Sequence, residues 1–465
     1  MTGRHYDPPT ALGFSAAVVL LWRPLYLCDG GFWLSFGAVL AMILFLPEFR
    51  GLPFQGFLAS LSVNLMLFPI ILYYFYEFPI YSTILNLWVV PLSSALLALG
   101  MAGSLTCFLF PWAGEGILKI CAWILTLFER SCLFMLELPG SRWVAGRPGG
   151  VRIGLYFGIL LLIYVLWKRW KKVWPLCLYG IGICLLVYRP FDTGTLSAVV
   201  LDVGQGDCIF IRGPEGGAYL VDAGSSDVGN VGQYRIEPFL KSEGVGKLDY
   251  VWVTHGDEDH IGGILELLER QNIGVKIGAL VLPPREVWDE KLENLGRTAR
   301  SFGTDVLVMG EGEKIREGEL ILTCLGPGER ERISPGNEAS LVLAVQYGAF
   351  DMLLTGDVEG KGETLLTRKL LEAYPDTEWE VLKVAHHGSK TSTGEAFLQA
   401  VRPGYACISA GRGNRYGHPH EETLERLGAY GATVLSTQNL GAVMIQVVEF
   451  EMKIQYTMKE AGAYL

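Results

Sequence analysis

Charged residues are scarce in this 465-residue sequence, and the scarcity is confined to its first part. Only 18% of the residues are charged, against roughly 25% in an average soluble domain. Long apolar runs fill the sequence from about residue 11 to residue 188, whereas the charge density beyond residue 195 is ordinary. We therefore expect a membrane-embedded part at residues 1–190 and a soluble domain at residues 195–465, joined by the linker RPFDTGTLSA.

An excess of positive charge is also absent. The formal net charge of −10 argues against a strongly basic nucleic-acid surface over the whole chain, although a local patch or metal-mediated contact with phosphates stays open. The nine cysteines contain no CxxC pair, and no disulfide framework can be read from their spacing. Cys208, Cys324 and Cys407 lie in or beside strand-like runs and are predicted to be buried thiols.

Apolar runs of about 20 residues are typical of membrane-spanning helices. About seven candidates occur, at residues 11–28, 32–47, 54–76, 80–104, 114–137, 151–168 and 173–189. The densest basic cluster, WKRWKKVW, lies between the last two and contains Lys168, Arg169, Lys171 and Lys172. The positive-inside rule places this cluster in the cytoplasm and the second part of the chain outside it, although the preceding loop is also basic.

The second part alternates strand-like segments with Gly-rich turns and helix-like stretches. Runs such as LSAVVLDV, CIFIRG and AYLVDAG have the period-two pattern of antiparallel hairpins. Helix-like stretches follow at 261–271, 359–373 and 420–430. Helices on the outer faces of two packed sheets would bury these strands, so we predict an αββα sandwich.

Six of the seven histidines fall in three short stretches of this second part, each just after a strand-like run. A shared sheet edge would gather these residues, which are His255, His260, His386, His387, His418 and His420. In THGDEDHIGG, His255 and Asp257 stand two residues apart and can face one metal ion, while Asp259 and His260 can face a second. Two divalent ions roughly 3.5–4 Å apart can activate water and stabilise a phosphate or acyl oxygen. A polar loop capped by Asp259 is the alternative.

The motif HGDEDHIGG, with VDAG upstream and LLTGD downstream, resembles the metallo-β-lactamase superfamily. The segments LDVGQGD, LKVAHHGS and YGHPH resemble the soluble domain of ComEC-type competence proteins, and the run PTALGFSAAVVLLWRPLYLCDGGFWLSFGAVLAMILF resembles that family's channel helices. The resemblance covers nearly the whole chain. The family usually begins with further helices and a small extracytoplasmic β domain, so we expect a chain that lacks the family's N-terminal part.

The resemblance implies roles for individual residues. His255 and Asp257 match ligands of the first metal, Asp259 and His260 match ligands of the second, and Asp357 matches the bridging carboxylate. The late histidine ligand is His386 or His387, with His386 favoured because it ends the strand directly. Catalytic roles are expected for Asp257, Asp357 and His387, the last through contact with a phosphate or as an acid.

One expected ligand is missing, and further residues are candidates for supporting roles. Many superfamily members place a histidine before the bridging aspartate, but SPGNEASLVL has none, so Asn337 or a water takes its place. This oxygen-rich first site favours Mn²⁺ or Mg²⁺ over Zn²⁺. Residues expected to support a ligand histidine, or to contact the substrate or metal, are Asp207, Asp222, Ser389, Arg415 and His418; their alternative role is in turns and helix caps.

The function implied by the resemblance is DNA internalisation during competence. The domain would hydrolyse phosphodiester bonds and degrade one strand while the other crosses the membrane. Such a protein works with DNA, lipid, a DNA receptor and a motor ATPase, and homo-oligomerisation is left open. The alternatives are a membrane-tethered hydrolase of a smaller phosphoester or envelope substrate, and a transporter whose soluble domain only binds or gates.

Overall fold

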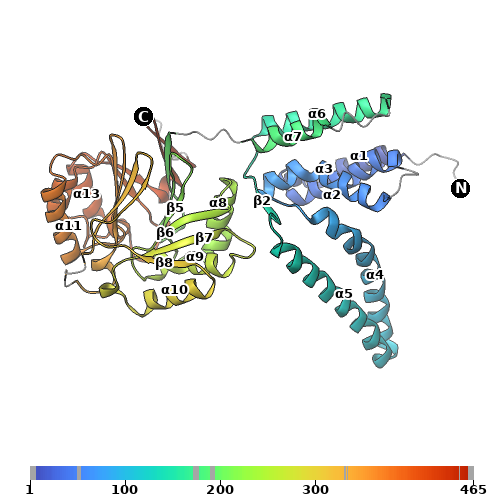
Figure 1. The fold of residues 1–465 in the computed structure, drawn as a ribbon, viewed down its shortest axis with the longest axis horizontal. Helices are drawn as coiled ribbons and strands as arrows, with labels where there is room; N and C mark the ends of the chain where they lie inside the picture. Colours follow the sequence, from blue (N-terminus) through green and yellow to red (C-terminus); the bar gives the residue numbers. More distant parts are fainter. Residues whose placement is uncertain are drawn as a thin grey trace. The chain divides into compact units, whose positions relative to one another are not determined.

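The computed structural model describes residues 7–49, 54–170, 177–188, 194–328, 331, 333–449 and 451–458. Contacts divide the chain into two compact units, Met1–Arg189 with Lys241–Gly244, and Pro190–Leu240 with Val245–Leu465. The first unit is helical, whereas sheets flanked by helices make up the second (Figure 1). Lys171 and Lys172 of the basic cluster, and residues 189–193 of the linker, lie outside the described residues.

Each of the apolar runs predicted in the first part contains a helix. These helices are α1 (Pro8–Trp22), α2 (Gly30–Phe45), α3 (Gln55–Phe75), α4 (Ser82–Leu109), α5 (Pro111–Glu137), α6 (Gly150–Trp170) and α7 (Cys177–Val187). The helix α1 ends before Pro24, which begins a short 3₁₀ turn, η1 (Pro24–Cys28). Two short strands, β1 (Glu77–Pro79) and β2 (Arg142–Val144), pair antiparallel.

Four of the described helical segments are long and apolar enough to cross a membrane: Gly30–Glu48, Gln55–Phe75, Ser82–Leu109 and Gly150–Trp170. Large apolar side chains point outward from this unit, and Leu21, Phe108 and Trp112 are each more than three quarters exposed. Side chains of this kind are stable against lipid and costly in water. The helices are therefore those of a membrane protein, and the number of crossings stays a prediction.

The second unit contains two mixed sheets, as predicted for an αββα sandwich. The eight-stranded sheet has the order β17-β16-β3-β4-β5-β6-β7-β8, and the seven-stranded sheet has the order β15-β14-β13-β12-β11-β10-β9. The strands β5 to β8 run parallel to one another, as do β12 to β15. Their bounds are β3 (Thr195–Val200), β4 (Cys208–Arg212), β5 (Ala218–Ala223), β6 (Lys247–Trp252), β7 (Lys276–Leu282), β8 (Asp305–Val308), β9 (Lys314–Glu317), β10 (Leu320–Gly326), β11 (Val342–Tyr347), β12 (Phe350–Leu354), β13 (Val381–Lys383), β14 (Tyr405–Ile408), β15 (Thr433–Ser436), β16 (Val443–Val448) and β17 (Glu451–Tyr456).

The apolar core lies in three layers. Side chains of both sheets, such as Trp252 and Leu343, pack between them. The outer face of the first sheet packs against α8 (Glu237–Ser242), α9 (Glu258–Glu269) and α10 (Glu290–Ser301). The outer face of the second packs against α11 (Gly360–Ala373), α12 (Glu395–Val401) and α13 (Glu421–Ala429). The helices α9, α11 and α13 were predicted; α10 and α12 were not.

Candidate metal centre

The histidines and aspartates of the predicted site lie in loops that leave the carboxyl ends of parallel strands. Asp222 is near the end of β5, and the THGDEDH loop joins β6 to α9. Asp357 follows β12, and His386 and His387 follow β13 in the short turn η7 (Ala385–Gly388). Neighbouring parallel strands end at the same edge of a sheet, so the loops of each sheet lie together at one edge. Side-chain contacts then join the loops of the first sheet to the loops of the second.

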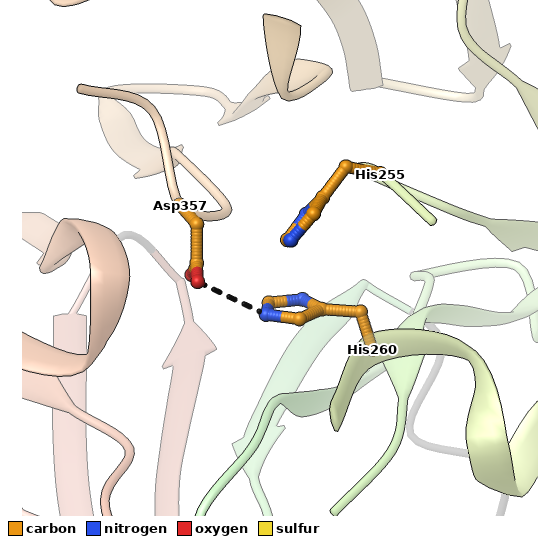
Figure 2. A group of neighbouring side chains, drawn as sticks. All are labelled: His255, His260 and Asp357. Carbon is orange, nitrogen blue, oxygen red and sulfur yellow. Dashed lines mark ion pairs between the residues drawn. The ribbon is translucent and has the colours of Figure 1, made fainter. Parts of the chain in front are cut away.

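His255, His260 and Asp357 form the centre of the cluster (Figure 2). The two imidazole rings lie 4.1 Å apart between centroids. Nε2 of His260 is 3.3 Å from Oδ2 of Asp357. One ligand atom from each of the three buried side chains lies within 4.8 Å of the others. This spacing is compatible with joint coordination of one ion.

A second set of ligand atoms adjoins the first. Nε2 of His387 lies 3.4 Å from Oδ2 of Asp259 and 3.6 Å from Oδ2 of Asp357. Asp259, His260 and His387 form a second group of the same compactness, and Asp357 joins His387 in another. Asp357 therefore belongs to one group with His255 and to another with His387, a position that is compatible with two neighbouring ions.

Four atoms in this cluster lack the partners that buried polar atoms normally have. Among the residues that the structure describes, no hydrogen bond reaches Nε2 of His255, His260 or His387, or Oδ1 of Asp357, and all four atoms are buried. An unsatisfied buried polar atom costs about 1–3 kcal/mol, and most such atoms in proteins are paired. Nitrogen and carboxylate oxygen are ligands of divalent metals, so the donor set fits such ions.

Hydrogen bonds on the outer side of the rings orient these nitrogens. Oδ2 of Asp222 is 2.8 Å from Nδ1 of His260, and both Asp222 oxygens also accept hydrogen bonds from Thr254. Nδ1 of His387 is 2.9 Å from the carbonyl oxygen of Ser409. Each contact places a proton on Nδ1 and leaves Nε2 to face the cluster, as in metal-binding histidines.

The charges of the cluster are strongly coupled. Burial alone would lower the pKa of His387, but the carboxylates of Asp357 and Asp207 outweigh it and raise that pKa to about 10. The pKa of His260 is likewise raised well above its usual value against the effect of burial, by Asp357 and Asp222. The pKa of Asp357 is lowered despite burial, chiefly by His387 and His260. These raised pKa values favour the protonated forms of His260 and His387, and a divalent ion would displace those protons on binding.

Two of the predicted ligands, His386 and Asp257, lie outside the compact groups. His386 is 3.9 Å from Asp357, and its Nδ1 contacts Glu359 at 3.1 Å, so it lies outside the compact groups. The geometry favours His387 as the late ligand, the role that was expected of His386. Asp257 is 44% exposed and its Oδ1 lies 2.5 Å from Nζ of Lys291, but its Oδ2 lies 3.6 Å from Nε2 of His255, the residue with which it is predicted to face one ion.

The remaining residues that were predicted to support the site differ in how deeply they are buried. Nδ2 of Asn337 lies 3.3 Å from Glu359 and 3.5 Å from Nε2 of His386, so Asn337 stands beside His386. Ser389 is buried and hydrogen-bonds Thr391. Nδ1 of His418 is 3.3 Å from Nε2 of Gln205. Arg415 is exposed beside Tyr416.

Sequence reasoning missed one buried ion pair beneath the cluster. Nζ of Lys383 lies 2.7 Å from Oδ2 of Asp207, and both side chains are fully buried. The other Asp207 oxygen is 3.4 Å from Nδ1 of His387. Asp207, a candidate supporting residue, thus links Lys383 to a predicted ligand. The signal was present as a single lysine within the apolar strand segment EVLKVA.

Comparisons with known proteins divide the chain in two. Residues 1–170 match the model of the competence protein family, and residues 201–412 match that of the metallo-beta-lactamase superfamily. The chain is 32% identical over 457 residues to ComE operon protein 3 of Bacillus subtilis, covering 93% of this chain and 57% of that protein. It is 29% identical to Recombination protein 2 of Haemophilus influenzae, covering 97% and 59%, and 29% identical to competence protein ComA of Neisseria gonorrhoeae, covering 94% and 59%.

These relatives are matched in both units. The chain spans less than three fifths of their length. The helical first unit corresponds to the competence region, and the αββα sandwich with its His/Asp cluster corresponds to the hydrolase superfamily. The chain thus joins a region that matches the competence protein family to a domain that matches the metallo-beta-lactamase superfamily, the arrangement of ComEC-type proteins.

Proposed function

We propose that this protein takes part in DNA uptake and that its second unit is a metal-dependent phosphodiesterase that degrades the strand that is not transported. The observation that carries the proposal is the convergence of four buried ligand atoms that have no hydrogen bond, from His255, His260, His387 and Asp357, in a ComEC-type chain. Such an arrangement fits hydrolysis better than binding alone, because binding does not require a metal pair.

Each side chain of the cluster has a defined task in this proposal. Divalent ions, when bound, supply an activated water and neutralise the charge that develops on the phosphate. His255, Asp259, His260, Asp357 and His387 hold the ions. The donor set mixes imidazole with carboxylate, which fits Mn²⁺ or Zn²⁺, whereas three imidazoles are more than Mg²⁺ usually accepts.

His418 is suited to contact the phosphate. Gln205 accepts a hydrogen bond from Gly411 through Oε1, which leaves its Nε2 to donate to Nδ1 of His418. The imidazole proton then resides on Nε2, which can donate to a phosphoryl oxygen. Burial and the neighbouring histidines lower the pKa of His418 to about 4, so this ring is neutral at pH 7.

The membrane part completes the proposal. We infer that about seven helices cross the plasma membrane and pass a single DNA strand, with the hydrolase on the extracytoplasmic side. Four helices of sufficient length and the match to the competence family support this inference. Nothing in the described residues resembles a motor, so a separate ATPase and a DNA receptor are expected as partners, and self-association is compatible with the scheme.

The decisive variant is Asp357→Asn in the full chain, purified in detergent. The substitution keeps the shape of the side chain and removes the charge shared between the metal groups. We expect Mn²⁺-dependent cleavage of labelled single-stranded DNA by the parent protein, loss of at least 100-fold in rate in the variant, and loss on addition of a chelator. Asp351→Asn, on the strand β12 that precedes Asp357, is the matched control and should retain activity.

Each result has one meaning. Cleavage at the parent rate by Asp357→Asn would show that the cluster is not the active site. Hydrolysis of a small phosphoester without cleavage of DNA would replace the nuclease by a hydrolase of envelope material. Bound metal without turnover of either substrate would indicate a binding or gating domain.

A further inference from the structure

An exposed aromatic side chain stands next to the candidate metal centre. Tyr416 lies in the loop between β14 and α13 and is 43% exposed. Its ring is stacked on that of His418, with centroids 5.7 Å apart and planes at 21°. One tyrosine ring is thus held nearly parallel to a buried imidazole while a large part of the tyrosine surface faces solvent.

The stacked pair connects the surface to the metal ligands. The ring of His418 lies 6.1 Å from that of His387 and 5.4 Å from that of His386. The ring of His387 in turn lies 5.4 Å from that of His260. A molecule resting on Tyr416 would therefore be separated from His387, a predicted metal ligand, by the ring of His418.

Hydrogen bonds hold this loop in one shape. Oδ1 of Asn414 accepts from the backbone nitrogens of Tyr416 and His418, and its Nδ2 donates to the carbonyl oxygens of Gly411 and His418. Nε2 of Gln438 donates to the same two carbonyls. An aromatic ring on a fixed loop can bind a partner with little loss of conformational entropy.

Two cationic residues, Arg415 and Lys390, lie in or beside the loop that carries Tyr416. The guanidinium of Arg415 lies over Tyr416, with Cζ 4.8 Å from the ring centroid and Nη2 2.6 Å from Oη. The backbone nitrogen of Lys390 donates to Nδ1 of His420, which places Lys390 beside the same loop. Within the described part of the chain, neither Arg415 nor Lys390 forms an ion pair with a carboxylate. Both charges are therefore available to phosphates.

We propose that Tyr416 is a stacking platform for a base of the substrate strand next to the cleaved phosphate, and that Arg415 leaves the ring to bind a flanking phosphate. Aromatic rings bind bases of single strands without sequence preference, and arginine contributes both charge and stacking. The inference rests on the proposed nuclease function and adds the polymer contact that the metal cluster lacks. The platform favours single strands, because bases in a duplex are already stacked.

The test measures binding of fluorescein-labelled single-stranded DNA to the full chain in detergent. Asp357→Asn serves as the background, so that the DNA is not cleaved. Adding Tyr416→Ala is expected to weaken binding by about five- to 100-fold, whereas Tyr416→Trp should bind as well as the tyrosine. Tyr430→Ala is the matched control, because Tyr430 is 38% exposed at the far end of α13 and should not contribute.

A second oligonucleotide separates stacking from a structural effect. A strand whose bases are replaced by abasic sites lacks the rings that would stack and keeps the phosphates. The tyrosine protein should bind this strand more weakly, and Tyr416→Ala should make no further difference. A loss of the same size with both strands would show that Tyr416 only shapes the loop.

The failure of this inference differs from the failure of the proposed function. If the parent protein cleaves DNA and Tyr416→Ala binds single strands as tightly as its background, the platform is refuted and the nuclease stands. If the parent protein neither binds nor cleaves DNA, the proposed function falls, and the platform falls with it.

Discussion

The buried Lys383–Asp207 pair places two opposite charges in the interior, immediately behind a predicted metal ligand. Two charges in a low-dielectric interior are tolerated only together, because each loses its hydration. The pair also positions a carboxylate oxygen 3.4 Å from Nδ1 of His387. At the residue scale, the ion pair therefore affects both the stability of the domain and the orientation of the His387 ring.

Lys383→Met should therefore destabilise the protein and weaken metal binding. Removing one member of a buried pair costs about 3–5 kcal/mol, because the other charge remains unpaired. Thermal unfolding of the metal-free full chain would show this as a lowered midpoint. A competition assay with a metal indicator should show weaker binding, by about tenfold or more.

Two comparison proteins complete that experiment. The double variant Lys383→Met/Asp207→Asn removes both charges and should recover part of the lost stability. Lys276→Met changes an exposed lysine at the start of β7 and should alter stability by no more than about 0.5 kcal/mol. If Lys383→Met unfolds at the same temperature as Lys276→Met, the pair has no such role.

Some of the site could be predicted from single residues and some could not. His255 and Asp357 come shortly after β6 and β12, and Asp259 and His260 lie in the first turn of the helix that follows β6, so their position at the sheet edge was predictable. The choice between His386 and His387 was not, because both have left-handed backbone angles, with φ of 49° and 54°, and strand alternation no longer indicates where each ring points. The contact of Asp257 with Lys291 was not predictable either, because the two residues are 34 positions apart in the sequence.

At the scale of elements, the turn η7 and the loop before α13 support each other. Gly388 has a φ of +83°, and a Cβ added there would lie 2.6 Å from Cβ of Pro419. The backbone nitrogen of His420 also donates to the carbonyl oxygen of Gly388. The turn that carries His387 and the loop that carries His418 are thus in direct contact.

Gly388→Ala should displace both the turn η7, which carries His387, and the loop before α13, which carries His418. The left-handed backbone costs an L-residue about 1–3 kcal/mol, and the contact with Pro419 adds a displacement of the loop. We expect a lower unfolding temperature and metal binding weakened by about 10- to 100-fold, measured by the same indicator assay.

Gly413→Ala isolates the backbone contribution. Gly413 also has a left-handed φ of +62°, but nothing lies within 4 Å of a Cβ added there. This variant should lose some stability and keep its metal affinity. Equal metal affinity in the two variants would mean that contact between the segments does not maintain the site.

The elements themselves were predicted with uneven success. The runs of the membrane part and the helices α9, α11 and α13 have long apolar faces, and their positions were predictable to within a few residues. The helix α10 was missed although Leu292, Leu295 and Ala299 form a buried stripe, because six charged residues mask that stripe in the sequence DEKLENLGRTARS. The helix α12 has only seven residues, too few for a clear period.

For the whole molecule, the side of the membrane on which the hydrolase works is the main prediction. The cluster at Lys168 and Arg169 ends α6 and is expected in the cytoplasm by the positive-inside rule. A thiol-reactive maleimide that cannot cross membranes tests this in intact cells. The background replaces the cysteines of the membrane part with serine, and Cys208, Cys324 and Cys407 are buried.

Ser301→Cys places an exposed thiol in the hydrolase unit, at the end of α10, and Lys168→Cys places one in the basic cluster. We expect the first to react in intact cells and the second only after lysis. The reverse pattern would put the hydrolase in the cytoplasm. It would then require DNA to be degraded after transport.

The pairing of β3 with β16 has a consequence for synthesis of the protein. Thr195–Val200 lies between β4 and β16 in the sheet, and its partner Val443–Val448 is made almost 250 residues later. On the ribosome, one edge of β3 must therefore wait unpaired until nearly the whole hydrolase has been translated. Asp357 and His387 are also made late, so most of the membrane part is synthesised long before the set of predicted metal ligands is complete.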